Sequence, residues 1–262
     1  MLITEKKLRK LVRKALLNEG IYDPGILKAV FMAGGPGSGK SYTAKIIFGG
    51  DPKSSVAAST ATGLKLVNSD PAFEYFLEQI GISPKDLAKM SDEEFKAVTE
   101  PPDSPRGKAK RLRNKAQAQY IQGRLGLVID GTGDDYAKIA AKKAALEEAG
   151  YDTYMIFVNT SLNVAQERNA QRDRVLKEDL VEEIWHKVQQ NMGGFQNLFG
   201  AENFTIVDNT VYGPLPKEIS AAARNFISRP VKNRVGCTWI EQELQAKGPK
   251  ATLPKCSGAF RG

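Results

Sequence analysis

The segment that most constrains the fold of this chain is a glycine-rich run at residues 34–41. An apolar run at residues 27–33 precedes it and a helical pattern follows it, and the run matches G-x-x-x-x-G-K-[ST] at every fixed position. Its glycines let backbone N–H groups converge on phosphate oxygens, and the N-terminus of the next helix adds positive charge. The run therefore predicts a strand, a phosphate-binding loop (P-loop) and a helix that together bind a nucleotide. The predicted nucleotide-binding residues are Gly34, Gly35, Pro36, Gly37, Ser38, Gly39, Lys40, Ser41 and Tyr42, with Lys40 at the β- and γ-phosphates and Ser41 on Mg²⁺.

Short apolar runs alternate with helical patterns from residue 27 onward. The runs predict strands at residues 27–33, 64–68, 125–129, 154–159 and 204–207. Strands of this kind, joined by helices, form a parallel sheet that is covered on both faces. The fold class is therefore α/β, with a doubly wound parallel five-stranded sheet.

An insertion of about 55 residues separates the second and third predicted strands, which is longer than an ordinary crossover. It contains an aromatic-rich helix that begins near Phe73, a proline-rich break near Pro101, and a helix over residues 106–124 that is basic throughout. We expect residues 71–124 to form a helical cap over the site of the second substrate.

The net charge of +8 is unevenly distributed along the chain. Residues 1–20, 104–124 and 228–262 carry +4, +7 and +5, so the remaining chain carries −8. This asymmetry favours local contacts with anions. The predicted organisation is a basic amphipathic helix at residues 1–24, a main domain at 25–228, and a basic extension at 229–262 with one helix around 239–246.

Two strand ends offer carboxylates for chemistry. Asp70 follows the second strand in Asn68-Ser69-Asp70-Pro71, where it can accept a proton from an attacking hydroxyl. The alternative is that Asp70 only caps the helix that begins at Pro71. Asp130 follows the third strand, where it is either a ligand to the Mg²⁺ shell or a turn residue, and Thr132 beside it is a candidate substrate contact.

Three arginines follow the fourth strand in a helical pattern. Arg168 and Arg172 have i, i+4 spacing and Arg174 lies near the next turn, so a hinged segment can bring guanidinium groups to a transferring phosphoryl group. The alternative is a solvated helix face. No Asp-Glu pair ends a strand, which disfavours a motor-type ATPase.

Together these motifs resemble the zeta-toxin and polynucleotide-kinase group of P-loop kinases. The resemblance covers about residues 26–228 and includes the P-loop, Asn68-Ser69-Asp70, Asp130-Gly131-Thr132, the arginine-rich segment at 167–174 and Asp208-Asn209-Thr210. It implies a P-loop kinase-type fold, with ATP and Mg²⁺ as cofactors. It further implies that Asp70 activates the acceptor hydroxyl, that Arg168, Arg172 and Arg174 supply lid charges, and that Asn209 lies near the adenine.

The basic cap points to the acceptor. Its cations suit a phosphate backbone, and an aromatic ring there can stack on a base. We therefore expect nucleic acid as substrate. The resemblance implies that the acceptor is then a 5′-hydroxyl or a hydroxymethylated pyrimidine of phage DNA. The alternatives are kinase action on a UDP-linked amino sugar, as in the toxins, and a nucleotide-gated nucleic-acid-binding or virion protein without transferase activity. The candidate substrate contacts in the cap are Arg106, Lys110, Arg113 and Tyr120.

The remaining sequence signals concern compartment and source. Cys237, Cys256 and the single His186 have no metal-ligand spacing, and no apolar run has the length of a membrane span or the form of a secretory signal. We therefore expect a cytoplasmic protein without a membrane partner. The basic N-terminal helix resembles leader helices of some tailed-phage proteins, which would make that compartment the host cytoplasm.

Overall fold

The computed structural model describes residues 25–49, 62–172, 174–211 and 213–247, together with Ile21, Thr60 and Cys256. The basic helix predicted within residues 1–24 lies outside the described residues, except for Ile21, which is buried in the core.

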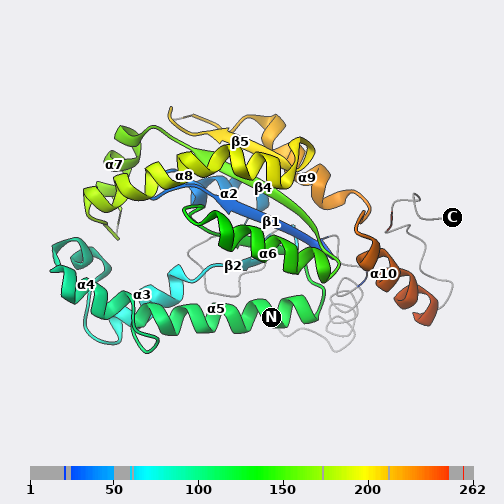
Figure 1. The fold of residues 1–262 in the computed structure, drawn as a ribbon, viewed down its shortest axis with the longest axis horizontal. Coiled ribbons are helices and arrows are strands. Elements are labelled where there is room, and N and C mark those ends of the chain that lie inside the picture. Colours follow the sequence, from blue (N-terminus) through cyan, green and yellow to red (C-terminus); the bar gives the residue numbers. More distant parts are fainter. Residues whose placement is uncertain are drawn as a thin grey trace, which may run out of the picture.

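The predicted α/β fold is confirmed, and its centre is a five-stranded parallel sheet (Figure 1). The strands are β1 (Lys28–Ala33), β2 (Lys65–Val67), β3 (Leu127–Asp130), β4 (Asp152–Asn159) and β5 (Phe204–Asp208), in the spatial order β2-β3-β1-β4-β5. β1 thus lies between β3 and β4. In such a sheet, ligands bind beyond the carboxyl ends of the strands, where the connections diverge to the two faces.

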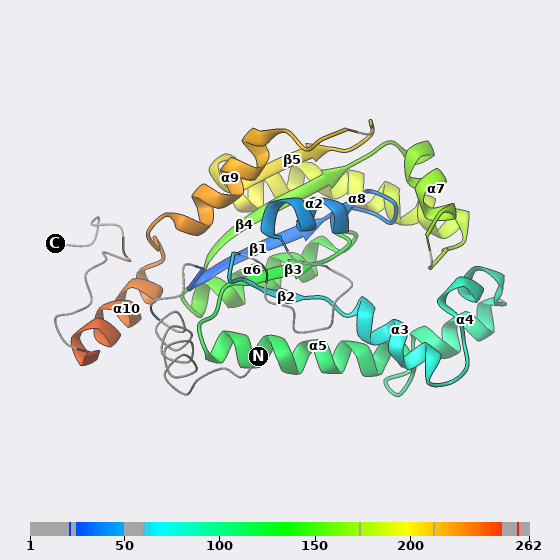
Figure 2. The same ribbon diagram turned by 180° about the vertical axis from the view of Figure 1, so that it is seen from behind.

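Side chains of β1 alternate between two buried layers, as a strand covered on both faces requires. Ala29 and Phe31 pack toward α6 (Tyr136–Glu148) and α8 (Glu178–Phe199), which cover the face seen in Figure 1. Val30 and Met32 pack toward α2 (Lys40–Phe48) and α9 (Lys217–Ser228) on the opposite face, which is seen in Figure 2. The sheet is therefore doubly wound, and its rigid edge can hold catalytic groups in place.

The insertion between β2 and β3 forms four helical segments with a small core of their own. They are α3 (Asp70–Glu78), the 3₁₀ helix η2 (Pro84–Lys89), α4 (Asp92–Thr99) and α5 (Pro105–Gln122). Ser104 caps α5 by accepting a hydrogen bond from Gly107 N at 3.1 Å, and Pro105 occupies its first turn. α5 runs along the β2 side of the sheet (Figure 1). The N-terminal half of α5 lies beside α3. The four helical segments share a small core of buried residues: Ala72, Phe73, Leu77, Leu87, Val98 and Ala109.

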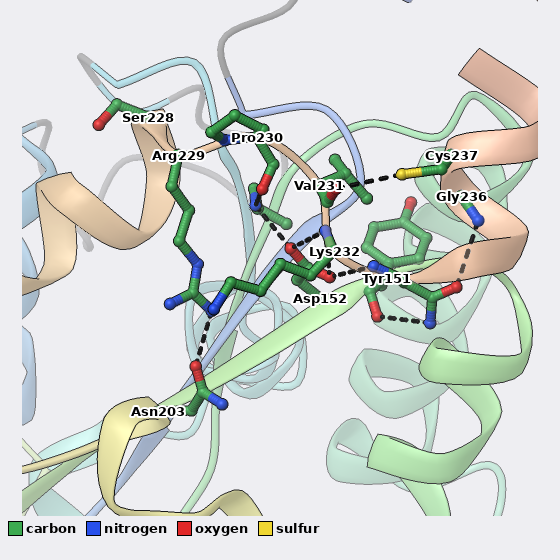
Figure 3. Close-up of polar contacts among 12 residues, drawn as sticks. Tyr151, Asp152, Asn203, Ser228, Arg229, Pro230, Val231, Lys232, Gly236 and Cys237 are labelled. Atoms are coloured by element: carbon green, nitrogen blue, oxygen red, sulfur yellow. Dashed lines mark hydrogen bonds and ion pairs between the residues drawn. The ribbon is translucent and has the colours of Figure 1, made fainter. Parts of the chain in front are cut away.

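The segment after α9 packs against the amino edge of the sheet (Figure 3). Asp152 at the start of β4 accepts hydrogen bonds from Lys28 Nζ at 2.7 Å and from the backbone N–H groups of Lys232 and Asn233 at 2.8 to 3.1 Å. Burial lowers the pKa of Lys28, and Asp152 opposes that shift. α10 (Arg234–Lys247) follows, and its buried Cys237 and Ile240 belong to the main core.

α10 extends the helix that the sequence predicted around residues 239–246. Between α7 (Leu162–Ala170) and α10 the chain also forms a short 3₁₀ helix, η3 (Ala201–Asn203). Within the described segments, no helix is both long and apolar enough to cross a membrane.

Candidate functional site

A cavity of about 340 Å³ lies at the carboxyl edge of the sheet. The P-loop, the ends of β2 and β3, the cap and the segment after α7 all contribute to its wall. Its charged lining is mostly cationic, and the cations come from four separate parts of the chain: the P-loop, α5, α6 and the segment after α7. The predicted site residues that line it are Pro36, Lys40, Ser41, Asp70, Arg106, Lys110, Arg113, Asp130, Thr132, Arg172 and Arg174.

The P-loop fits closely between its neighbours because its glycines lack side chains. Gly37 has φ +75°, and a Cβ atom there would lie 2.1 Å from the carbonyl oxygen of Ala165. Gly39 has φ +90°, and a Cβ atom there would lie 2.0 Å from Nδ2 of Asn209. Both positions favour glycine on backbone grounds and on packing grounds.

Lys40 points back over the loop. Its Nζ atom donates to the carbonyl oxygens of Gly34 and, at 3.4 Å, of Gly35. Burial lowers the pKa of Lys40, and Asp130 opposes that shift. Ser41 and Tyr42 are exposed in the first turn of α2, but only Ser41 lines the cavity.

Asp70 lies at the centre of the charged network. Its Oδ1 atom accepts a hydrogen bond from Arg106 Nη1 at 2.7 Å, and its Oδ2 atom accepts one from Arg174 Nη2 at 2.8 Å. Burial would raise the pKa of Asp70, but Arg174 and Arg106 outweigh it and hold this pKa well below its usual range. Asp70 is itself the first residue of α3, and Ser69 precedes it as the N-cap. The carboxylate therefore faces the cavity, and the alternative that it only caps α3 is wrong.

Phe73 forms the floor under these charges. The guanidinium carbons of Arg106 and Arg174 lie 5.0 and 5.8 Å from the centre of its ring, a cation–π arrangement. Phe73 is only 3% exposed. It therefore holds the arginines in place, and its ring is not available to stack on a base.

Asp130 and Ser41 fit a Mg²⁺ site. The Oδ1 atom of Asp130 is buried and has no hydrogen-bond partner among the described residues. Burial raises the pKa of Asp130, and Lys40 opposes that shift. The Asp130 oxygen without a partner, the hydroxyl group of Ser41 in the same cavity and a phosphate together would supply the oxygen ligands that Mg²⁺ prefers. The described residues contain no group of three or more His, Cys, Asp or Glu side chains that could hold a metal without such a phosphate.

The three arginines after β4 divide between two places. Arg172 and Arg174 line the cavity, whereas Arg168 donates from Nη1 to the carbonyl oxygen of Asn209 at 2.7 Å. The predicted i, i+4 relationship of Arg168 and Arg172 is wrong because α7 ends at Ala170. Asn169 stops the helix there, since its side chain exchanges hydrogen bonds with the backbone of Leu176 at 2.8 and 3.1 Å.

Asn209 joins β5 to the P-loop. Its Nδ2 atom donates to the carbonyl oxygen of Ser38 at 2.7 Å, and its backbone N–H donates to Asn159 O at 2.9 Å. Asn209 is thus part of the support of the loop, and Arg168 is held against it.

The candidate substrate contacts of the cap lie in different environments. Arg106, Lys110 and Arg113 have i, i+4, i+7 spacing on α5 and face the cavity together. Tyr120 does not line the cavity; it packs against the main core, so the prediction that it stacks on a base there is wrong. Thr132 lines the cavity beside the P-loop, where its carbonyl oxygen accepts a hydrogen bond from Gly34 N at 2.8 Å.

Two lysines of α6 complete the cationic wall, and the sequence analysis did not identify them. Lys138 and Lys142 line the cavity opposite α5. Burial, together with Arg113 and Lys138, lowers the pKa of Lys142 to about 8. Their i, i+4 spacing places both lysines on one face of the helix, but lysines on an alanine-rich helix are typical of a face exposed to solvent, so the sequence did not single them out.

Comparison with known proteins gave a match to one family model and to solved structures of similar fold. Residues 99–212, less than half of the chain, match the family model Zeta toxin. A structure from the PezAT chromosomal toxin–antitoxin system of the human pathogen Streptococcus pneumoniae superposes with a TM-score of 0.50 at 12% identity, over 94% of this chain and 97% of that one. The AvrRxo1-ORF1:AvrRxo1-ORF2 structure with sulphate ions has a TM-score of 0.51 at 15% identity, over 80% of this chain and 64% of that one. The search of curated proteins gave no match.

Proposed function

We propose that this chain, which resembles the zeta toxins over residues 99–212 and has the fold of a P-loop kinase, transfers the γ-phosphoryl group of ATP to a hydroxyl group on nucleic acid. The acceptor is a 5′-hydroxyl or a hydroxymethylated pyrimidine.

One observation carries this proposal: Asp70 lies between the P-loop and a stripe of cations on α5. The loop side of the cavity holds Lys40, Arg172 and Arg174, which suits a triphosphate. The α5 side holds Arg106, Lys110 and Arg113, which suits an acceptor with phosphates of its own. Arg106 already pairs with Asp70, but a small neutral alcohol would leave Lys110 and Arg113 without an ion-pair partner.

The transfer follows from the position of Asp70. The acceptor hydroxyl donates a hydrogen bond to the carboxylate, and its oxygen attacks the γ-phosphorus in line with the bond to the leaving ADP oxygen. As the new P–O bond forms and the bond to ADP breaks, the hydroxyl proton passes to Asp70. Each carboxylate oxygen has more than one lone pair, so the hydroxyl can bind while Arg106 and Arg174 stay in place.

The low pKa of Asp70 defines its role further. The carboxylate is ionised throughout the physiological range, so it orients the hydroxyl from the outset and accepts the proton late. Arg172 and Arg174 balance charge on the transferring group. Mg²⁺, when bound at Ser41 and Asp130, neutralises charge on the β- and γ-phosphates.

A nucleotide-linked amino sugar is the second candidate acceptor. The match of residues 99–212 to the Zeta toxin model favours it, because the resemblance to the zeta toxins implies a UDP-linked amino sugar as acceptor. Such a compound also carries phosphates, so the cations of α5 do not separate the two candidates. A binding protein without transferase activity is disfavoured by Asp70 and the two arginines that line the cavity.

A parallel transfer assay tests the proposal. The chain is incubated with γ-labelled ATP, Mg²⁺ and one of three acceptors: 5′-hydroxyl oligonucleotides, DNA with hydroxymethylated pyrimidines, or UDP-linked amino sugars. Label in either nucleic acid, lost in Lys40→Ala, supports the proposal. Label in the sugar alone overturns the acceptor, and label in none of them while ATP binds overturns the transferase.

A further inference from the structure

Four cations form a group at the end of the cavity that the P-loop does not reach. Lys110 and Arg113 come from α5, and Lys138 and Lys142 come from α6; we call these four residues the α5–α6 cation cluster. Two separate helices thus point like charges into one space.

No salt bridge joins the α5–α6 cation cluster to a carboxylate among the described residues; the charge of Asp70 acts on Arg113 without pairing with it. Arg113 donates to the amide oxygen of Asn114 at 2.8 and 3.2 Å, and Lys142 lies 3.5 Å from the amide oxygen of Gln117. Neither is an ion pair. Asp134 and Asp135 line the same cavity at the start of α6, but no described salt bridge joins either to the cluster, and Asp135 instead accepts a hydrogen bond from the backbone N–H of Lys138.

This arrangement of like charges is electrostatically unfavourable in the absence of a bound anion. Burial lowers the pKa of Lys110, and Arg106, Lys138 and Arg113 lower it further. Burial likewise lowers the pKa of Arg113, Arg106 lowers it further, and Asp70 opposes the shift. Arg113 and Lys142 are partly buried, whereas Lys110 and Lys138 are exposed. Cations that repel one another in one cavity are stable only at a cost, which an anion bound among them lowers.

The position of the cluster relative to Asp70 defines what such an anion belongs to. Arg106 pairs with Asp70 at 2.7 Å, and Lys110 and Arg113 follow it on the same face of α5. At 1.5 Å per residue, they stand about 6 Å and about 10 Å further along the helix. Lys40, on the P-loop side, feels the charges of Asp130, Arg172, Asp70 and Arg174 instead. Asp70 therefore lies between two cationic regions, one around Lys40 on the P-loop and the other on α5.

We propose that the α5–α6 cation cluster is a second phosphate site, which binds a phosphate or diphosphate group that the acceptor already carries. This inference rests on the proposed function for the identity of the acceptor. Its consequence is that the natural acceptor is a phosphorylated alcohol, such as a nucleotide at a strand end or a nucleotide sugar. A free nucleoside or a free sugar lacks the group that the cluster holds.

Binding of inorganic pyrophosphate tests the site without any phosphoryl transfer. The wild-type chain is first saturated with ADP and Mg²⁺ to occupy the P-loop, and pyrophosphate is then titrated by calorimetry. The test variant is Lys110→Gln/Lys142→Gln. The matched control is Lys108→Gln/Lys115→Gln, which removes two exposed lysines of α5 that do not line the cavity.

We expect pyrophosphate binding to weaken about tenfold or more in the test variant, because it loses two charge-assisted contacts. In the control it should stay within about twofold. Thermal melts of both variants verify folding. No binding to the ADP-loaded wild type, or equal loss in test and control, overturns the second site.

A comparison of acceptors distinguishes failure of the second phosphate site from failure of the proposed kinase activity. A nucleoside 3′-monophosphate and its free nucleoside, and likewise a UDP-linked sugar and its free sugar, are compared as acceptors. Phosphoryl transfer without pyrophosphate binding would contradict the second phosphate site and support the proposed kinase activity. Pyrophosphate binding that depends on the cluster, without transfer to any acceptor, would contradict the proposed kinase activity and support an anion-binding site.

Discussion

Asp70 and Arg174 stand 104 residues apart in the chain, yet their side chains meet at 2.8 Å. Asp70 opens the cap at the end of β2, and Arg174 follows α7 on the other side of the cavity. Arg106 from α5 holds the second carboxylate oxygen at 2.7 Å. One side chain therefore connects the cap, the sheet edge and the arginine segment.

Asp70→Asn should abolish transfer while sparing ATP binding. The amide keeps the shape of the side chain but cannot take the proton, so kcat should fall about 10²- to 10⁴-fold. Labelled transfer measures the first effect and calorimetry with ATP the second. Asp103→Asn is the matched control in the cap, because its pair with Arg111 is exposed. Transfer that survives in Asp70→Asn would remove Asp70 from the proposed role.

Gly37→Ala should disrupt the nucleotide site far more than Gly81→Ala. Both residues have a φ near +75°, so both alanines strain the backbone. Only at Gly37 does the new Cβ atom meet a backbone carbonyl, that of Ala165 at 2.1 Å; at Gly81 nothing lies within 4 Å. ATP titrations should show lost binding for Gly37→Ala and near-normal binding for Gly81→Ala. Equal losses would contradict the packing described around the P-loop.

Asp152→Ala should destabilise the whole fold. It leaves the buried Lys28, whose side chain is 1% exposed, without its carboxylate partner and with only the carbonyl oxygen of Pro230 at 3.3 Å, and it removes the acceptor of two backbone N–H groups. Breaking such a buried pair costs about 3–5 kcal/mol in the free energy of unfolding. Urea unfolding followed by circular dichroism measures the change. Asp86→Ala, which breaks an exposed pair with Lys89, should leave the unfolding midpoint close to that of the wild type.

Anion binding at the α5–α6 cation cluster should weaken as pH rises through about 8. Lys142 has a pKa lowered to about 8 by burial and by Arg113 and Lys138, so above this pH it loses the charge that attracts a phosphate. Lys110 faces the same space, its pKa is also lowered, and Asp134 and Asp135 are the carboxylates that line it. Pyrophosphate titrations at several pH values measure the effect. Lys142→Arg should flatten the profile, since arginine stays charged.

The same shift has a consequence for stability. In the unfolded chain Lys142 has its ordinary pKa of 10.5, so between about 8 and 10.5 the unfolded state binds more protons than the folded one. Its contribution to the free energy of unfolding therefore rises with pH across this window. Urea unfolding at pH 8 and 10 should show a smaller rise for Lys142→Gln than for the wild type.

The fold could be predicted from local patterns because its strands are short, apolar and separated by helices. All five predicted strands lie within two residues of the observed bounds at each end. The order of the strands could not be predicted, since it depends on which face each helix covers. The contribution of Ile240 and Cys237 to the main core was also missed, because a basic, proline-containing tail gives no sign of burial.

In the site, residues next to strand ends were easier to predict than residues on helices. Asp70 and Asp130 follow strands directly, so the parallel sheet fixes their place. Arg168 was assigned to the lid on helical spacing, which fails because Asn169 ends α7 before Arg172. Lys138 and Lys142 lie near the cations of α5 only because α6 packs opposite α5, and no local sequence pattern indicates that packing.

α10 and the cavity lie at opposite ends of the strands. Gly236 packs against Gly150, just before β4 begins, whereas the P-loop and Asp130 follow the far ends of β1 and β3. The eight residues of β4 span about 26 Å between these edges (Figure 1). A fluorophore placed at the exposed Val235, or a surface tether joined to α10, can therefore report on single molecules while both substrates keep free access.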